Sequence, residues 1–316
     1  MDVCPADSGA IARAAERLIR GKLVAFPTET VYGLGADATN GRAVAAVFEL
    51  KGRPQFNPLI VHLPDTATAQ LHGHLDDRAL SLAQAFWPGP MTLVVPRRAG
   101  SPLCDLVSAG LDTVALRVPA HPVARTLLQA CALPVAAPSA NPSGYLSPTT
   151  AAHVSEAFGD ADLLVLDGGP CPVGLESTVI DLSDPNRIGL LRAGAVTPEQ
   201  LAERVGAVTA ADPGAAIRAP GMLPSHYAPR CRVRLDATVV ASDEALLGFG
   251  PALPTGAAIS RNLSPGGDLR EAAANLFAML HELDRPGITA IAVMAIPGHG
   301  LGLAIRDRLA RAAAEH

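Results

Sequence analysis

The sequence is poor in cysteine and has no long apolar run. Its five cysteines are scattered without a CxxC pair, and an odd number fits neither a disulfide framework nor a zinc knuckle. No apolar segment approaches the roughly 20 residues that span a bilayer. The first residues also lack the charged-then-apolar order of a signal peptide. We therefore expect reduced thiols, no membrane association and a cytoplasmic location.

The sequence also lacks an excess of basic residues. Lysine and arginine total 25 against 30 aspartates and glutamates, so the net charge of -5 gives no global field that would hold nucleic acid. A local basic groove stays open as an alternative. Apolar residues make up 49% of the chain and charged residues 17%, which is typical of a globular enzyme. At about 150 residues per domain, 316 residues favour two domains.

Common nucleotide-binding signatures are absent as well. No GxxxxGK[ST] occurs, and Gly33-Leu-Gly35 is not followed by the third glycine of a dinucleotide loop. The segment PGHGLG at 297–302 offers amides that could receive phosphate, although such a segment is more often only a tight turn. His72 and His74 have no third ligand nearby. Any ATP site must be of another kind, and we predict no metal site built from protein side chains.

Alternating apolar patterns predict the organisation of the chain. Residues 1–206 mix helix and strand patterns, which indicates a layered α/β domain with a sheet of mixed direction. Residues 207–230, rich in Ala, Pro and Gly, are typical of a linker. Residues 231–316 predict a smaller α/β domain. Its expected elements are a strand at 232–235, helices at 243–247 and 268–283, a strand at 288–296 and a helix from 301.

Two cations lie two residues apart at the end of an expected helix over 40–50. Lys51 and Arg53 could converge on one point, which suits a triphosphate whose charge shifts during reaction. The alternative is favourable placement of both cations at a helix C-terminus. His62 follows on an expected strand over 59–63, and alone it fits a packed histidine better than a catalytic base.

Further polar residues gather at the ends of expected strands. On the strand over 113–118, Thr113 and Arg117 share one face, and an arginine there favours a carboxylate or phosphate partner unless it forms a surface ion pair. Ser139 and Asn141 end another strand in a cluster suited to phosphate or ribose, although many such clusters are only turns. The loop over 26–35 has glycines that would let a substrate approach the backbone. The remaining candidates are Ser147, Ser177 and Arg192.

In this order, the motifs resemble the Sua5/YrdC family of threonylcarbamoyl-AMP synthases, in its long form with an added C-terminal domain. The resemblance covers nearly the whole chain. It rests on the segments PTETVYGLG, KGR, NPLIVH, WPGPMT, TVALRVP, SAN, GLESTV, LLRAGAV, PGMLPSHYAP and GLGLAIRDRLARAA. Any one of these would be weak evidence, but ten in register are specific.

The resemblance implies a fold and a reaction. The fold would be a YrdC-like twisted mixed sheet with flanking helices, plus a smaller Rossmann-like α/β domain. The reaction would join L-threonine, bicarbonate and ATP into threonylcarbamoyl-AMP and pyrophosphate with the help of Mg²⁺, as a nucleotidyltransferase of the EC 2.7.7 type. A separate transferase complex would then place the threonylcarbamoyl group on adenosine 37 of tRNA.

The resemblance also implies roles for individual residues. Those expected to surround threonine are Thr30, His62, Arg117, Ala137 and Ser177. Those expected to hold ATP are Arg53, Asn57, Thr113, Ser139, Asn141, Ser147, Arg192 and Tyr227. Lys51 and Arg53 would act catalytically, because negative charge moves toward the departing pyrophosphate and needs fixed cations there. Arg117 would bind threonine's carboxylate.

Because the carbamate and the acyl-adenylate hydrolyse easily, a cover that excludes water is expected. We interpret the linker carrying Tyr227 as that lid. Two alternatives stay open. A carbamoyltransferase of the hydrogenase-maturation type would handle a similar adenylate, but it carries zinc-finger cysteine pairs that this sequence lacks. An RNA-binding module with weak tRNA contact would need a local basic groove.

Overall fold

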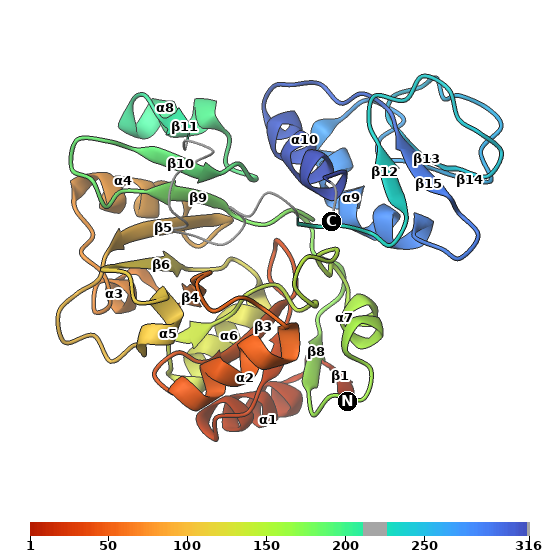
Figure 1. Cartoon of the computed structure of the whole chain (residues 1–316). Coiled ribbons are helices and arrows are strands. Elements are labelled where there is room, and N and C mark those ends of the chain that lie inside the picture. Colours follow the sequence, from red (N-terminus) through yellow and green to blue (C-terminus); the bar gives the residue numbers. More distant parts are fainter. Residues whose placement is uncertain (211–225, 315–316) are drawn as a thin grey trace.

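The computed structural model describes residues 1–210 and 226–314, and it has two α/β units (Figure 1). Most of the predicted linker, residues 211–225, lies outside the described residues. Within the described residues, no helix is both long enough and apolar enough to cross a membrane.

The large unit is built on an eleven-stranded sheet of mixed direction. The strands follow the order β1-β8-β2-β3-β7-β4-β6-β5-β9-β10-β11. Parallel pairs such as β4 with β6 alternate with antiparallel pairs such as β5 with β6, which confirms the predicted mixed sheet. The strands are β1 Asp2–Pro5, β2 Val24–Phe26, β3 Gly33–Asp37, β4 Ile60–His62, β5 Met91–Pro96, β6 Thr113–Arg117, β7 Val135–Ala136, β8 Leu164–Asp167, β9 Thr178–Asp181, β10 Gly189–Arg192 and β11 Thr209–Ala210.

Helices cover the two faces of this sheet unequally. Side chains of α2, α4, α5, α7 and α8 join one core with the strand residues on one face. On the other face, α1 and α6 pack over the β8, β2 and β7 end, where strand side chains such as Phe26 meet them. The helices are α1 Ser8–Ile19, α2 Gly41–Lys51, α3 Thr66–Ala69, α4 Asp77–Phe86, α5 Asp105–Ser108, α6 Pro122–Cys131, α7 Ala151–Phe158 and α8 Pro198–Val205.

Beyond α6, the face that α1 and α6 cover continues over β4, β6, β5 and β9. There the apolar side chains form only a small cluster of Ile60, Val94, Ala115 and Val179. Because side chains alternate along a strand, Ile60 shares its face with His62, and Ala115 shares its face with Arg117. This part of the sheet therefore presents polar strand ends next to a small apolar patch.

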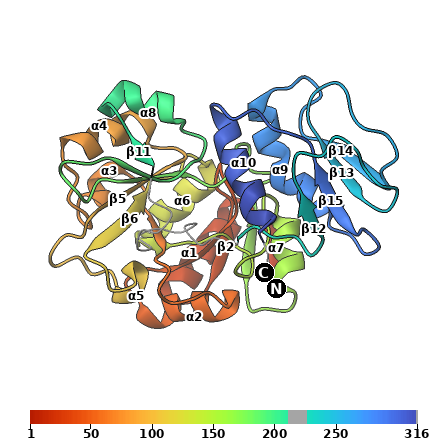
Figure 2. The same cartoon turned by 45° about the horizontal axis from the view of Figure 1, so that its top comes forward.

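The second unit has a four-stranded parallel sheet in the order β12-β15-β13-β14, which confirms the expected smaller parallel α/β fold. Helices α9 and α10 lie between this sheet and the large unit (Figure 2). The elements are β12 Arg232–Arg234, β13 Ala245–Gly248, β14 Ile259–Asn262, α9 Leu269–Leu283, β15 Ala290–Val293 and α10 Leu301–Ala312.

Two local predictions were wrong. The expected helix over 243–247 is the strand β13, whose four residues are all buried. A short apolar run has no period that separates a buried strand from a buried helix. The loop expected over 26–35 contains the strand β3. Gly35 serves packing, because a Cβ there would lie 2.8 Å from the ring of Phe26.

Candidate functional site

A cavity with polar side chains in its wall lies on the face of the large sheet that α1 and α6 cover only in part, and residues 226–227 close one side of it. Side chains from the ends of three strands and from the loops after β2 and β7 enter it. The residues that line the cavity are Thr28, Thr30, Val31, Gly33, Arg53, Ile60, His62, Arg117, Ala137, Pro138, Ser139, Glu176, Arg192, His226 and Tyr227.

The sheet topology explains why three functional side chains meet. His62, Arg117 and Arg192 are the last residues of β4, β6 and β10. β4 runs parallel to β6. β5 is antiparallel to β6, and β9 is parallel to β5. Because β10 is antiparallel to β9, it runs in the same direction as β6. All three strands therefore end at one edge of the sheet, where ligands commonly bind in α/β folds.

Three buried guanidinium groups give the cavity its positive character. Arg53, Arg117 and Arg192 are each at most 7% exposed. Among the described residues, Arg53 donates only to carbonyls, those of Asn57 at 3.2 Å and Pro58 at 3.0 Å. Burial and the charge of Arg192 lower the pKa of Arg53 to about 10. Arg53 and Arg192 have no carboxylate among their hydrogen-bond partners in the described residues, and buried cations without such a partner favour an anionic ligand.

Lys51 lies behind this cavity. It is the last residue of α2, which Gly52 ends in a left-handed conformation with φ of 58°. Its ammonium donates to the carbonyls of Ser139 and Asn141. Burial and the nearby charge of Arg53 lower its pKa well below the usual value. Through these two hydrogen bonds Lys51 holds the loop after β7 in place. Its expected catalytic role stays a prediction.

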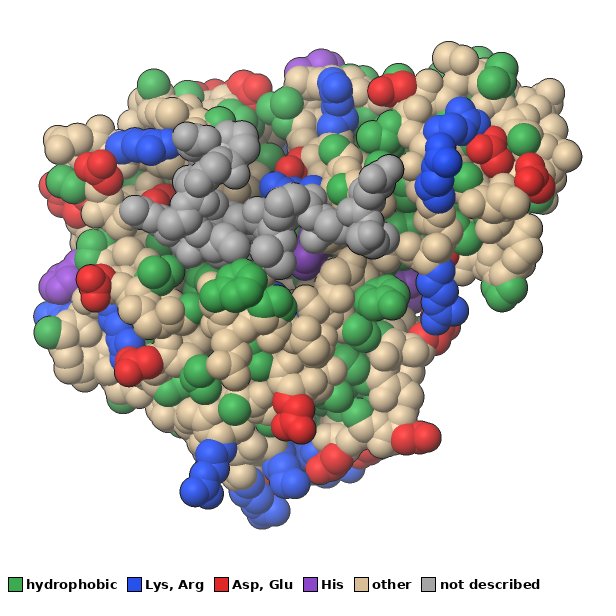
Figure 3. Space-filling view, viewed as in Figure 1, with side chains coloured by type: hydrophobic (Ala, Val, Ile, Leu, Met, Phe, Trp, Pro, Cys, Tyr) green, Lys and Arg blue, Asp and Glu red, His purple; other side chains and the backbone are tan. Residues whose placement is uncertain are grey.

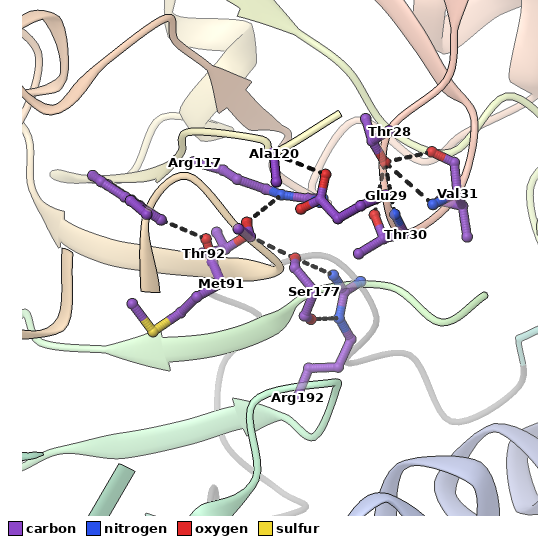
Figure 4. A network of polar contacts seen from close by, with 12 residues as sticks. Thr28, Glu29, Thr30, Val31, Met91, Thr92, Arg117, Ala120, Ser177 and Arg192 are labelled. Carbon is purple, nitrogen blue, oxygen red and sulfur yellow. Dashed lines mark hydrogen bonds and ion pairs between the residues drawn. The ribbon is translucent and has the colours of Figure 1, made fainter. Parts of the chain in front are cut away.

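One buried ion pair anchors the cavity end near β6. Arg117 donates to Oε1 of Glu29 at 2.6 Å, and the backbone N–H of Ala120 donates to Oε2 of the same carboxylate at 3.0 Å (Figure 4). Burial raises the pKa of Glu29, but the charge of Arg117 and the hydrogen bonds outweigh it and lower the pKa. Thr28 closes the loop after β2 by accepting from the N–H groups of Thr30 and Val31.

Ser177 links two strands at the other end of the cavity. Arg192 donates to the carbonyl and to the hydroxyl of Ser177, both at 3.0 Å. The Ser177 hydroxyl also lies 2.7 Å from that of Thr92 on β5 (Figure 4). Within the described part of the chain, Arg192 therefore hydrogen-bonds to a neutral partner.

Several buried polar atoms around the cavity have no partner among the described residues. They include Nδ1 of His62, Nδ1 of His226, the hydroxyl of Tyr227 and both amide atoms of Asn57. Buried polar groups in folded proteins are nearly always hydrogen-bonded. Burial, with the charge of Arg117, lowers the pKa of His62 to about 3, so this ring is neutral at pH 7. These unpaired atoms indicate a ligand site.

The cavity brings together most of the predicted site residues. Those that line it are Thr30, Arg53, His62, Arg117, Ala137, Ser139, Arg192 and Tyr227. Others lie behind its wall and contact lining residues, as Ser177 contacts Arg192, Ser147 contacts Glu176, and Asn57 contacts Arg53. The backbone carbonyl of Asn141 accepts a hydrogen bond from the Lys51 ammonium. Thr113 begins β6, at the end opposite Arg117, next to the apolar patch of the sheet.

Sequence reasoning missed three charged or aromatic groups that shape the cavity. Glu29 is the partner of Arg117, Glu176 lines the wall, and His226 stands beside Tyr227 with ring centroids 4.1 Å apart. Glu29 and Glu176 lie inside the motifs PTETVYGLG and GLESTV. A carboxylate within a largely apolar motif was the signal that could have found them.

The described residues contain no group of three or more His, Cys, Asp or Glu side chains that could hold a metal ion. Glu176 is the one carboxylate among the residues lining the cavity, and both its oxygens already accept hydrogen bonds. These side chains do not fit a resident Mg²⁺ site. Magnesium commonly binds to substrate phosphates with few protein ligands, so any Mg²⁺ would arrive with a nucleotide.

The fold and the cavity together define an α/β protein with a candidate anion site at the carboxyl ends of its strands. Two family models match it, one described as "Telomere recombination" over residues 16–194 and one as "Threonylcarbamoyl-AMP synthase, C-terminal domain" over residues 196–314. The threonylcarbamoyl-AMP synthase of Pyrococcus abyssi is 40% identical over 95% of this chain and 93% of its own length. That of Bacillus subtilis is 38% identical over 96% and 92%.

Solved structures agree with the sequence comparison. The crystal structure of P. abyssi Sua5 complexed with L-threonine has a TM-score of 0.89 and 36% identity, covering 99% of this chain and 96% of that one. E. coli YciO, at 22% identity and a TM-score of 0.53 over 60% of this chain, shows the shared fold alone. The chain belongs to the Sua5/YrdC family of threonylcarbamoyl-AMP synthases.

Proposed function

We propose that this protein is an enzyme that joins L-threonine, bicarbonate and ATP into threonylcarbamoyl-AMP and releases pyrophosphate, in the first step of threonylcarbamoyladenosine formation at position 37 of tRNA. The observation that carries the proposal is the cavity with three buried arginines in a chain that is similar to curated threonylcarbamoyl-AMP synthases over nearly its full length. In class terms it would be a nucleotidyltransferase of the EC 2.7.7 type.

The charges of the cavity support a division between its two substrates. Arg117 lines the cavity beside Glu29 and would bind the carboxylate of threonine. Neutral His62, on the neighbouring strand, would accept or donate a hydrogen bond to the amine or carbamate. Thr30, Ala137 and Ser177 complete the proposed threonine set.

The opposite side of the cavity suits the nucleotide. Arg53 and Arg192 would face the phosphates, with Ser139 presented by the loop that Lys51 holds. Ile60, which lines the cavity and packs in the small apolar cluster with Ala115, would contact the adenine, with Thr113 on the same strand as Ala115. The proposed ATP set also includes Asn57, Asn141, Ser147 and Tyr227. This gives each buried unpaired atom of Asn57 and Tyr227 a candidate partner.

The reaction needs only positioning and charge. The threonine amine takes up CO₂ to form a carbamate, whose oxygen then attacks the α-phosphorus of ATP as the bond to pyrophosphate breaks. Arg53 and Arg192 would stabilise the charge that moves onto the leaving group. Mg²⁺, bound to the ATP phosphates, would neutralise part of their charge. Burial of the cavity keeps water from the carbamate and from the adenylate.

Mass spectrometry tests this proposal directly. The purified protein is incubated with ATP, Mg²⁺, bicarbonate and L-threonine, and pyrophosphate is measured in parallel. Threonylcarbamoyl-AMP should form only in the complete mixture, and omission of threonine or bicarbonate should abolish it. ATP hydrolysis without the adenylate would reject the synthase and move the carbamoyltransferase alternative ahead. A cytoplasmic location and delivery to a separate tRNA threonylcarbamoyltransferase complex remain predictions.

The RNA-binding alternative receives no support from the visible surface. Acidic and basic side chains are interspersed across the face that carries the cavity, and they form no extended basic stripe there (Figure 3). Single-strand binding surfaces combine a basic groove with aromatic platforms. A weak tRNA contact stays a prediction.

A further inference from the structure

Arg308 of α10 crosses from the second unit into the wall of the cavity. Its side chain is 1% exposed, and its Nε donates to Oε2 of Glu176 at 2.9 Å. Glu176 belongs to the large unit and lines the cavity. The two residues are 132 positions apart in sequence. A fully buried charge pair between units is costly to form, so it needs an explanation beyond simple attachment.

The contacts of Arg308 hold two lining residues at once. Its guanidinium carbon lies 5.3 Å from the centre of the Tyr227 ring, in the range of a cation–π contact. Tyr227 has a left-handed backbone with φ of 65°, which is uncommon for a residue other than glycine. Nη1 of the same guanidinium donates to Asp307 at 2.7 Å, so Arg308 has two carboxylate partners. Arg308 thus sets the positions of Glu176 and Tyr227 together.

The direction of the Glu176 carboxylate matters because Arg192 lines the same cavity. Arg308 takes Oε2 and the hydroxyl of Ser147 donates to Oε1, so both oxygens are occupied. Among the described residues, the hydrogen-bond acceptor of Arg192 is the neutral Ser177. Without Arg308, Glu176 would be a buried carboxylate lacking its ion-pair partner, and Arg192 is a buried cation lining the same cavity that could pair with it.

We propose that Arg308 is a positioning residue through which the second unit keeps Glu176 away from Arg192, and so keeps the nucleotide side of the cavity positively charged. The second unit is then part of the nucleotide site and not an independent attachment. This rests on the proposed function only in naming ATP as the anion; the electrostatic role holds for any anionic ligand of this cavity.

The full-length protein and four variants test the proposal. Arg308→Met should raise the KM for ATP and the Kd for ATP by about tenfold or more, while the KM for threonine changes less than about twofold. Glu176→Gln removes the competing charge, so the double variant should recover most of the lost ATP affinity.

The matched control is Arg306→Met, an exposed arginine on the same helix, which should behave as wild type. The fourth variant, Arg308→Lys, should raise the KM and the Kd for ATP by a smaller factor. It replaces Arg308→Met in the test if that variant does not fold.

The outcomes separate the two proposals. ATP binding by calorimetry is measured apart from product formation, so a wild-type protein that binds ATP but makes no adenylate would reject the proposed function and leave the Arg308 test intact. The role of Arg308 is overturned if ATP affinity is unchanged in both the Met and Lys variants. It is also overturned if Glu176→Gln gives no rescue, or if the KM for threonine rises as much as the KM for ATP, since those results mark a merely structural contact.

Discussion

Two buried arginine–carboxylate pairs stand at the two ends of the cavity, and they are arranged in opposite ways. In Glu29–Arg117 the arginine lines the cavity and the carboxylate stays behind it. In Glu176–Arg308 the carboxylate lines the cavity and the arginine stays behind. The first pair lies within one unit, whereas the second joins both units. The same pair of groups can therefore place either its cation or its carboxylate against the cavity, depending on which member the fold puts in the wall.

Breaking the first pair should have the largest effect. Arg117→Met removes the cation that faces the cavity and leaves Glu29 buried without its partner. We expect product formation to fall about 1,000-fold and the free energy of unfolding to drop by about 3 to 5 kcal/mol. Turnover assays and urea unfolding measure the two effects. Arg13→Met, which removes an exposed pair with Asp2, is the control and should leave both within error. Near-normal turnover in Arg117→Met would contradict its role.

Acid should weaken both ends of the cavity, because a neutral histidine stands beside each pair. Burial lowers the pKa of His62 and of His226 to about 3 from an ordinary 6.5. A lowered histidine pKa means that the unfolded chain binds the proton first, so stability falls as pH drops from 6.5 toward 3. Between pH 7 and pH 5 we expect a loss of about 2 kcal/mol for each ring.

Urea unfolding at the two pH values measures this loss. His62→Gln and His226→Gln should each remove their own share of the pH dependence, and the double variant should remove both. The carboxylates act in a lower window, because the pKa values of Glu29 and Glu176 are lowered from 4.5 and their contribution is lost only below that value. Equal wild-type stability at pH 7 and pH 5 would show that these rings are protonated in the folded protein.

A milder change to the Glu29–Arg117 pair tests which substrate binds at that end of the cavity. Glu29→Gln keeps the shape but replaces one acceptor oxygen with an amide, so either Arg117 or the N–H of Ala120 loses its partner. We expect the KM for threonine to rise about tenfold with little change in the KM for ATP. Steady-state kinetics give both values. Glu16→Gln on the exposed side of α1 is the control. A rise in the KM for ATP alone would reverse the assignment of the two ends.

The smallest effect is expected at the edge of the apolar patch. Thr113→Val keeps the shape of the side chain and removes one hydroxyl, so the KM for ATP should rise roughly fivefold, as one neutral hydrogen bond allows. The KM for threonine should not change, because Arg117 lies at the other end of β6. Thr126→Val on the surface of α6 is the control. An unchanged KM for ATP would place the adenine elsewhere.

Local patterns predicted one part of the site well. Alternation along 113–118 placed Thr113 and Arg117 on one face, and the structure has them so on β6. The Lys51 and Arg53 spacing predicted a helix end, and α2 ends at Lys51. What Lys51 contacts was not predictable, because its carbonyl partners lie about 90 residues further along the chain. Periodicity describes a residue's neighbours in one element and says nothing of the neighbouring strand.

Non-local pairing accounts for the remaining surprises. Glu29 and Arg117 are 88 residues apart, and nothing near either residue indicates the other. The segment GLGLAIRDRLARAA, which contains Arg308, indicates membership of the family. A family resemblance does not show that α10 reaches Glu176. The error at 243–247 has a related cause, since only the sheet that surrounds β13 distinguishes it from a helix.

The long sequence separation of Glu176 and Arg308 also bears on how the protein is made. A ribosome that adds 5 to 20 residues per second would synthesise Glu176 roughly 7 to 26 s before Arg308. During that interval the large unit has a negatively charged wall without its counter-ion, and residues 226–227 have no α10 to pack against. The cavity can therefore acquire its final charge only after the second unit has been translated and folded. A nascent large unit should accordingly bind cellular ATP weakly.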